Sequence, residues 1–162
     1  MEKHLKVSAI KDGTVIDHLP TNALFKVIKI LELEQCSQMV TFGNNLDSKA
    51  MGTKAIIKIA NRFFADEVVN KIALVAPHAK LNTIRDYKVI EKRVVETPKE
   101  IIGIVNCFNP VCITNAENIT TRFEVSSVKP IALKCLYCEK ITNENEMVFR
   151  WFNQLTEINN EN

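Results

Sequence analysis

The sequence predicts an α+β fold in which a mixed domain is followed by a small β-rich domain. Before residue 97, two segments with helical apolar spacing alternate with short runs rich in β-branched residues. After that point, four of the five cysteines fall in a region with short β-rich runs and no strong helical pattern. The change occurs at Thr97-Pro98-Lys99-Glu100, so we expect domains at 1–97 and 98–162.

The first part of the N-terminal domain reads as two strands and a helix. Val7 to Ile10 and Gly13 to Leu19 are rich in β-branched residues and are separated by the turn dipeptide Asp12-Gly13. Thr21 or Asn22 can then cap a helix, since either side chain can accept a free backbone N–H. The helix carries apolar residues at i, i+3, i+4 and i+7, namely Leu24, Val27, Ile28 and Leu31.

The second part repeats this arrangement. Strands are expected at Met39 to Gly43 and Lys54 to Ile59, with a turn or loop at Asn44-Asn45. Asp66 can cap a second helix, which Pro77 closes because proline cannot continue the helical hydrogen bonds. That helix would bury Val68, Val69, Ile72, Ala73 and Val75. Two more strands are expected at 81–84 and 87–95.

The resulting order is strand, strand, helix, strand, strand, helix, strand, strand. Two helices on one face of a mainly antiparallel sheet are typical of the ferredoxin-like fold. In the C-terminal domain we expect strands at 101–105, 121–128 and 131–133, which suit a zinc-ribbon-like fold. Apolar residues then recur at helical spacing in the tail and predict a helix at 144–156, namely Val148, Trp151, Phe152 and Leu155.

Charge and hydropathy exclude several classes of partner. The formal net charge is +2, which is lower than expected of a general DNA-coating protein, so we expect no nucleic-acid partner. The charged start, Met1 to Lys6, is not followed by a long apolar region, and no run approaches the roughly 18 apolar residues of a membrane span. We therefore expect a cytoplasmic protein with no membrane partner, in which thiols stay reduced.

Two close pairs of cysteines indicate a metal site. Cys107 and Cys112 are separated by four residues, and Cys135 and Cys138 by two. Four thiolates form a closed tetrahedral zinc site, which is structural because no position is left for water or substrate. The alternatives are four unrelated thiols or a redox pair at Cys135-x-x-Cys138. Cys36 is left over and is interpreted as a plain, partly buried thiol.

No catalytic motif is visible in the chain. It has no glycine-rich phosphate loop, no Ser/His/Asp arrangement and no open-site metal motif. One alternative is a small ferredoxin-like enzyme that uses the adjacent Asp17 and His18 as an acid–base pair, although no nucleophile motif accompanies them. Another is a zinc-ribbon nucleic-acid module, suggested only by Lys129, Lys134, Tyr137 and Lys140.

Several stretches carry a more specific signal, in order and nearly without gaps from about Leu5 to Lys140. They are Gly13–Pro20, Met51-Gly52 with Lys54, Ile57–Ile59, Ala76-Pro77 followed by Asn82, Cys107–Thr114 and Leu133–Lys140. Together they resemble the regulatory chain of aspartate carbamoyltransferase, an enzyme of pyrimidine biosynthesis. The resemblance implies a non-catalytic chain that forms a homodimer, binds CTP or ATP in its N-terminal domain, and docks the catalytic chain through its zinc domain. UTP or a magnesium ion would be a further ligand, and three regulatory dimers would bridge two catalytic trimers.

The resemblance also implies a nucleotide site. It places Val7, Ala9 and Ile10 at the base, partly through their backbone groups. It places Asp17 near the ribose, and His18 near the ribose or the phosphates.

Further matched residues complete this site. Lys58 and Lys92 are implied to meet the phosphates and ribose as point charges, and Asn82 and Val89 to lie around the sugar and base. Lys54 precedes Lys58 by an even number of residues, so both side chains face one side of a strand and Lys54 can extend the basic patch.

The two ends of the chain depart from the family's pattern. His4 stands where the family often has a lysine near the phosphates. The tail after Lys140 is longer and more aromatic than expected. Its aromatic residues either add to the contact with the catalytic chain or pack on the zinc domain, and they are Phe149, Trp151 and Phe152.

Overall fold

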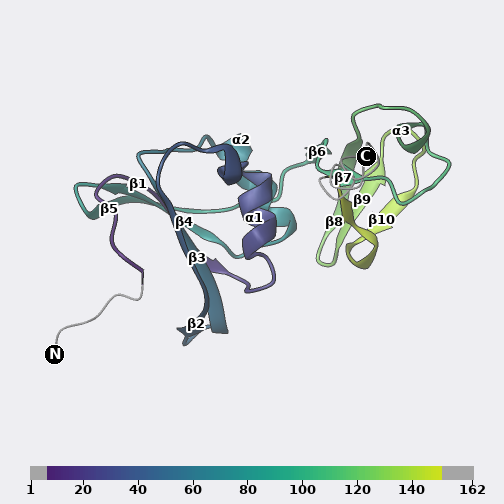
Figure 1. Cartoon of the computed structure of the whole chain (residues 1–162). Helices are drawn as coiled ribbons and strands as arrows, with labels where there is room; N and C mark the ends of the chain where they lie inside the picture. The colour runs from purple at the N-terminus through teal and green to yellow at the C-terminus, as the bar shows by residue number, and fades with distance from the viewer. Residues whose placement is uncertain (1–6, 151–162) are drawn as a thin grey trace, which may run out of the picture. The chain divides into compact units, whose positions relative to one another are not determined.

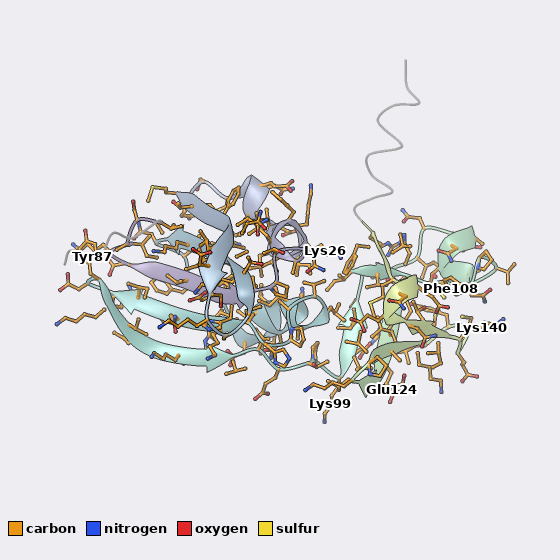
Figure 2. The ribbon with its side chains drawn as sticks, turned by 90° about the horizontal axis from the view of Figure 1, so that it is seen from below. Lys26, Tyr87, Lys99, Phe108, Glu124 and Lys140 are labelled. Carbon is orange, nitrogen blue, oxygen red and sulfur yellow. The ribbon has the colours of Figure 1, made fainter. Side chains whose placement is uncertain are left out.

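The computed structural model describes residues 7–150, and the chain divides into two compact units with their boundary between Thr97 and Pro98 (Figure 1). Side chains fill the interior of each unit separately (Figure 2). Within the described residues, no helix is long and apolar enough to cross a membrane.

The first unit is a five-stranded antiparallel sheet in the order β2-β3-β1-β4-β5. The order β2-β3-β1-β4, with a helix after β1 and another after β3, is that of a ferredoxin-like fold. β5 is added as an edge strand, so the prediction of the fold class is confirmed. The elements are β1 Gly13–Leu19, α1 Leu24–Ile30, the 3₁₀ turn η1 Leu33–Gln35, β2 Val40–Ser48, β3 Gly52–Ala60, α2 Asp66–Val69, the 3₁₀ turn η2 Asn70–Leu74, β4 Lys80–Arg85 and β5 Lys88–Val94.

The helices cover one face of this sheet, and strand alternation sends apolar residues toward them. Ile16 of β1, Ile57 of β3 and Leu81 of β4 are almost fully buried there against Leu24 of α1 and Ile72 of η2. The apolar side of α1 therefore packs against the apolar side of the strands beneath it. This contact is the main core of the unit.

The opposite face of the sheet, which we call the open face, has only a small apolar cluster. Val15 of β1 and Ile84 of β4 pack there with Ile10 and the half-buried Ile56. Strand alternation places every second residue of β1, β3, β4 and β5 on this face. Polar residues occupy much of the rest of it.

The segment Val7 to Ile10 was predicted as a strand, and the structure contradicts this. In the described residues it has irregular backbone and crosses the open face instead. Both edges of β1 are already paired, with β3 and β4, so no strand edge beside it is free to accept a further strand. β-branched composition alone therefore misidentified this segment.

Two other boundaries differ from expectation. Asn44 and Asn45 lie inside β2, where the register to β3 shifts by one residue and Asn45 adopts a left-handed φ of 56°. Instead of the expected turn, β2 thus contains one extra residue that forms a bulge. The second helix is a single α-helical turn, Asp66–Val69, that continues as a 3₁₀ helix to Leu74.

The second unit has a four-stranded antiparallel sheet in the order β10-β9-β8-β6, and a two-stranded sheet of β11 and β7. The expected strand at 101–105 is broken at Gly103, whose φ of 71° suits glycine. The elements are β6 Glu100–Ile102, β7 Val105–Asn106, α3 Ile113–Ala116, β8 Arg122–Val128, β9 Ile131–Cys135, β10 Ile141–Asn143, the 3₁₀ turn η3 Glu144–Glu146 and β11 Val148–Phe149.

The helix predicted at 144–156 is wrong as far as residue 150. Asn143 and Glu146 form a reciprocal capping box around one 3₁₀ turn, after which the chain becomes extended. Phe149 is buried and lies opposite Val105 in the small sheet, so strand pairing replaces the helix. The remaining residues of the apolar repeat, Trp151, Phe152 and Leu155, lie outside the described residues.

Candidate functional site

A row of side chains crosses the open face of the first unit. Lys58 of β3 lies opposite Val15 of β1, Val15 opposite Asn82 of β4, and Asn82 opposite Lys92 of β5. Directly opposed residues of an antiparallel sheet project from the same face. The sheet thus aligns three of the residues implied by the resemblance, although they are far apart in the sequence.

Lys58 anchors the N-terminal segment over this face. Its Nζ donates hydrogen bonds to the carbonyl oxygens of Val7 and Ser8, at 3.0 and 2.9 Å. Only 9% of its surface is exposed, and this burial lowers the pKa of Lys58, an effect that the nearby Asp17 carboxylate opposes. The segment carrying Val7, Ala9 and Ile10 is therefore held beside Lys58.

A bulge places Asp17 and His18 at the end of the row. The register between β1 and β3 shifts by one residue after Ile16, and His18 has a left-handed φ of 59°. The extra residue returns Leu19 to the helix-covered core, while Asp17 and His18 stay partly exposed. Nδ1 of His18 is buried and has no hydrogen-bond partner within residues 7–150.

Asp17 is the acceptor at this end of the face. Its Oδ1 lies 2.8 Å from Nζ of Lys54 and accepts the backbone N–H of His18 at 2.6 Å. Lys80 is its register partner on β4. A carboxylate is thus placed among basic groups, where it can also accept hydrogen bonds from hydroxyl groups.

Val89 lies further along β5, opposite Ile84 and beyond a register shift, and 47% of it is exposed. Val15 and Ile84 were not predicted as part of this face, because isolated apolar residues in strands read as core. The alternation in β1, with Ile16 facing the helices and Val15 and Asp17 facing away, is the signal that could have identified Val15.

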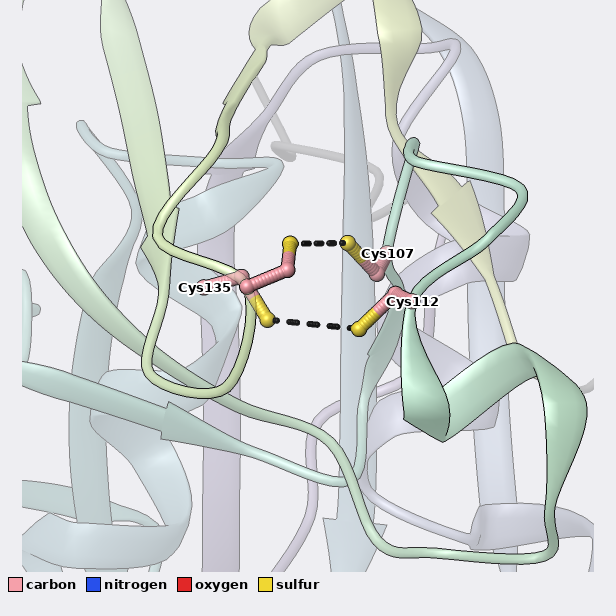
Figure 3. Close-up of side chains that lie close together, drawn as sticks. Cys107, Cys112 and Cys135 are labelled. Atoms are coloured by element: carbon pink, nitrogen blue, oxygen red, sulfur yellow. Dashed lines mark hydrogen bonds between the residues drawn. The ribbon is translucent and has the colours of Figure 1, made fainter.

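The second unit contains a cluster of four cysteines. The Sγ atoms of Cys107, Cys112, Cys135 and Cys138 all lie within 4.8 Å of one another. Cys107 and Cys138 are 3.6 Å apart, and Cys112 and Cys135 are 3.8 Å apart (Figure 3). A disulfide requires about 2.05 Å, whereas the edge of a tetrahedron with metal–sulfur bonds of about 2.3 Å is roughly 3.8 Å. The thiols therefore fit a tetrahedral metal site.

Two backbone turns hold these thiols. In the first, Asn115 donates to the carbonyl oxygens of Cys107 and Asn109, at 2.9 and 2.8 Å. In the second, Glu139 adopts a left-handed φ of 62° and its N–H donates to the carbonyl of Cys135 at 2.9 Å. Close spacing within each cysteine pair is what allows both turns to point two sulfurs inward.

The surroundings of Cys107 and Cys135 disfavour their thiolates, whereas those of Cys138 favour its thiolate. Burial raises the pKa of both Cys107 and Cys135. Burial also raises the pKa of Cys138, but hydrogen bonds from the Lys140 backbone and the Asn109 side chain outweigh it and lower that pKa to about 7. A bound cation would supply the positive charge that stabilises all four as thiolates.

Comparison with known proteins gives the same division of the chain. Residues 5–96 match the family model described as aspartate carbamoyltransferase regulatory chain, allosteric domain, and residues 99–148 match the model for its metal binding domain. The chain is thus similar to one family through both of its units.

Individual relatives cover nearly the whole chain. Aspartate carbamoyltransferase regulatory chains from Bacteroides fragilis and Pyrococcus abyssi are 54% and 52% identical to it, over 84% and 89% of this chain and 89% and 96% of theirs. That of Parabacteroides distasonis is 46% identical over 92% of this chain and 97% of its own. The resemblance seen in the sequence is confirmed: the chain belongs to the aspartate carbamoyltransferase regulatory chain family and is a regulatory chain, not a catalytic one.

Proposed function

We propose that this chain binds CTP or ATP on the open face of its N-terminal unit and passes the effect to a catalytic chain held by its zinc unit. The observation that carries the proposal is the row Lys58–Val15–Asn82–Lys92, which brings the implied phosphate and ribose ligands onto one face.

Lys58 is suited to a phosphate oxygen. An ammonium group has three N–H donors, and two of them are used on the carbonyls of Val7 and Ser8. Within residues 7–150 the third has no hydrogen-bond partner and can meet an anion, and burial strengthens the attraction between them. Lys92, on the exposed edge strand, adds a second positive charge.

The ribose and base can be held at the other positions. Asp17 can accept hydrogen bonds from ribose hydroxyls. Nδ1 of His18 can also form one, since within residues 7–150 it has no hydrogen-bond partner and only a 3.7 Å contact with Oδ1 of Asp17. Val7, Ala9 and Ile10 offer backbone N–H and C=O groups that can read the edge of a base. Asn82 and Val89 border the same region, Asn82 with an amide and Val89 with an apolar surface. UTP with Mg²⁺ would be a further ligand near Lys54.

The four cysteines would hold one zinc ion. Thiolates are soft ligands, and four of them in a tetrahedral arrangement are typical of zinc. The site is closed, so its role would be to stabilise the fold of the small unit. It would supply no chemistry to a reaction.

The two cysteine turns also present apolar side chains to solvent. Phe108 and Val111 lie on the first turn, and Leu136 and Tyr137 on the second, and all four are at least 43% exposed. Exposed apolar patches of this kind mark protein interfaces. We propose that this surface, the knuckle surface, contacts the catalytic chain, so the metal would shape the docking site.

A homodimer would form through β2. The sheet has two edge strands. β5 carries several charged residues, which protect an edge from pairing, whereas β2 has a single charge at Asp47. Phe42 of β2 is exposed and stacks edge-to-face on the exposed Phe25, with ring centroids 6.0 Å apart. We therefore propose that two copies meet at β2.

This dimer can be tested with Phe42→Lys, which places a cation on the β2 edge. Sedimentation equilibrium should show a dimer for the wild type and a monomer for this variant. Ile90→Lys on β5 is the matched control, because Ile90 is similarly exposed, and it should remain dimeric. If Ile90→Lys dissociates and Phe42→Lys does not, the interface lies on the other edge.

Nucleotide binding can be tested with Lys58→Ala and Lys92→Ala. Hydrogen bonds to charged groups contribute about 1.5–3 kcal/mol, so each variant should bind CTP and ATP roughly 10- to 150-fold more weakly. Calorimetric titration measures this. Lys71→Ala on η2 removes the same charge from an exposed site and should change affinity by less than about twofold. Unchanged affinity in both test variants would exclude the proposed face.

Zinc binding can be tested by metal analysis and chelation. We expect one zinc per chain, lost in Cys135→Ser and retained in Cys36→Ser, because Cys36 lies outside the cluster. Zinc contributes on the order of 10 kcal/mol to such small domains, so its removal should unfold the second unit. Circular dichroism would show this as lost ellipticity while CTP binding to the first unit persists. Full zinc content in Cys135→Ser would contradict the site.

Regulation can be tested by adding the chain to the matching catalytic trimer. We expect carbamoyl-aspartate formation to respond to CTP and ATP only when this chain is present. Val111→Asp on the knuckle surface should abolish that response by preventing docking, without affecting nucleotide binding. Val128→Asp lies at the other end of the β8–β9 hairpin and should keep the response. A response that persists in Val111→Asp would place the docking surface elsewhere.

A further inference from the structure

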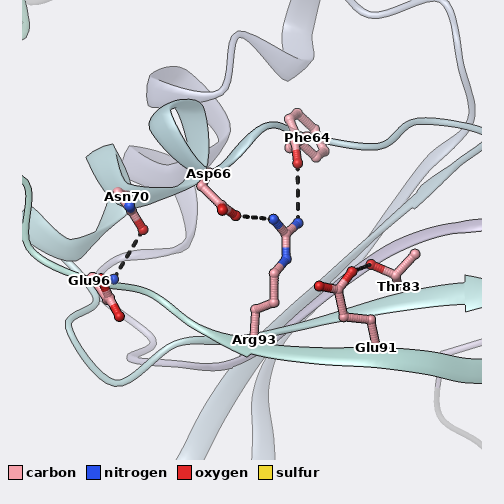
Figure 4. Close-up of polar contacts among 7 residues, drawn as sticks. All are labelled: Phe64, Asp66, Asn70, Thr83, Glu91, Arg93 and Glu96. Carbon is pink, nitrogen blue, oxygen red and sulfur yellow. Dashed lines mark hydrogen bonds and ion pairs between the residues drawn. The ribbon is translucent and has the colours of Figure 1, made fainter.

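Arg93 joins strand β5 to helix α2 on the helix-covered side of the sheet (Figure 4). Its Nη1 donates to Oδ1 of Asp66, the first residue of α2, and its Nη2 donates to the carbonyl oxygen of Phe64 at 3.2 Å. Phe64 belongs to the main core. The planar guanidinium therefore spans two acceptors on a segment that is fixed by packing.

This bridge matters because β5 is an edge strand. It has one strand neighbour, β4, and its register to that neighbour is interrupted by a shift between Thr83 and Ile84. Lys92 and Val89, two of the proposed nucleotide contacts, both lie on β5. Hydrogen bonds to β4 alone leave such a strand free to twist, so a tie to a second layer restricts it.

Arg93 and Lys92 are neighbours with opposite orientations. Lys92 lies opposite Asn82 on the open face, and Arg93 lies opposite Leu81 on the helix-covered face. A side chain held on one face of a strand fixes the backbone from which the next side chain leaves on the other face. The bridge thus acts on Lys92 through the backbone, with no contact between them.

A second tie lies three residues on. The backbone N–H of Glu96 donates to Oδ1 of Asn70 at 3.1 Å, immediately after α2. The segment Asp66 to Asn70 therefore holds β5 at Arg93 and also holds the chain where it leaves the sheet. Both ties border one groove of about 280 Å³ between α2 and β5.

We propose that the Asp66–Arg93 bridge is a positioning element for nucleotide binding: it holds edge strand β5 so that Lys92 and Val89 keep their places on the open face. This inference rests on the proposed function. Asp66 and Arg93 contact no nucleotide, since they lie on the other side of the sheet. Their effect is to preorganise the binding face before the ligand arrives.

Asp66→Asn and Arg93→Lys test this proposal, because they distinguish an effect of positioning on nucleotide affinity from an effect of net charge. Asp66→Asn makes the chain more positive, so long-range electrostatics alone would leave triphosphate binding unchanged or tighten it. Positioning requires the opposite, a weaker affinity. Arg93→Lys keeps the charge but loses the planar fork. Asp66 is 71% exposed at its side chain, so Arg93→Lys leaves no buried carboxylate unpaired.

We expect both variants to bind CTP roughly 2- to 30-fold more weakly in calorimetric titration, the range of about 0.5–2 kcal/mol found for residues that act on a site at a distance. Hydrogen exchange of the β5 amides should become faster in the same variants. Glu34→Gln is the matched control: it also removes a carboxylate from an exposed ion pair, with Lys29, but on η1. It should leave CTP affinity unchanged or slightly tighter.

The outcomes distinguish a failure of this inference from a failure of the proposed function. If wild type and all three variants bind CTP equally, the positioning role is overturned while nucleotide binding stands. If Glu34→Gln loses as much affinity as Asp66→Asn, the effect is general and the inference is again overturned. If the wild type itself binds no nucleotide, the proposed function fails, and the inference fails with it.

Discussion

The open face depends on one buried cation. An ammonium group with little solvent exposure is costly unless it is hydrogen-bonded, and Lys58 meets this requirement through two backbone carbonyls of the N-terminal segment. That requirement explains why Val7 to Ile10 crosses the sheet. It also leaves a positive charge beneath backbone groups of this segment, opposed by the charge of the Asp17 carboxylate. A face assembled for this cation is also suited to an anionic ligand that presents hydrogen-bonding edges.

The second unit has the same requirement for buried charge, but there the buried groups would be anionic. Buried sulfurs at Cys107 and Cys135 cannot easily ionise alone, because burial raises the pKa of each. A bound metal ion would remove that penalty and join the two backbone turns that carry the cysteines. The apolar side chains on those turns, including Phe108 and Leu136, are then held outward. In the proposed function, metal binding and partner docking would thereby be linked through geometry, in a unit too small to rely on its core alone.

The sequence predicted what local spacing determines. Apolar spacing in α1, the β-branched run of β1 and the two close cysteine pairs all act within a few residues, and each appears in the structure as expected. The failures depended on distant neighbours. Val7 to Ile10 has strand-like composition but no free strand edge, and Val148 and Phe149 pair with Asn106 and Val105, which no local pattern shows. The row of Lys58, Asn82 and Lys92 needed either strand register or family resemblance, because nothing in their spacing along the chain relates them.

The proposed site also limits where two effectors can differ. CTP and ATP share a ribose and a triphosphate, so Lys58 and Lys92 would meet the same groups in both. Only the base differs in size and in its hydrogen-bonding edge, and it would lie against the segment that carries Ala9 and against Val89. Lys58 holds the segment that carries Ala9. Val89 is held by its strand, β5, which Arg93 ties to the segment before α2. A larger base at this proposed site would therefore be accommodated by moving the N-terminal segment or β5, and the ties on those two elements would contribute to the free-energy difference between the effectors.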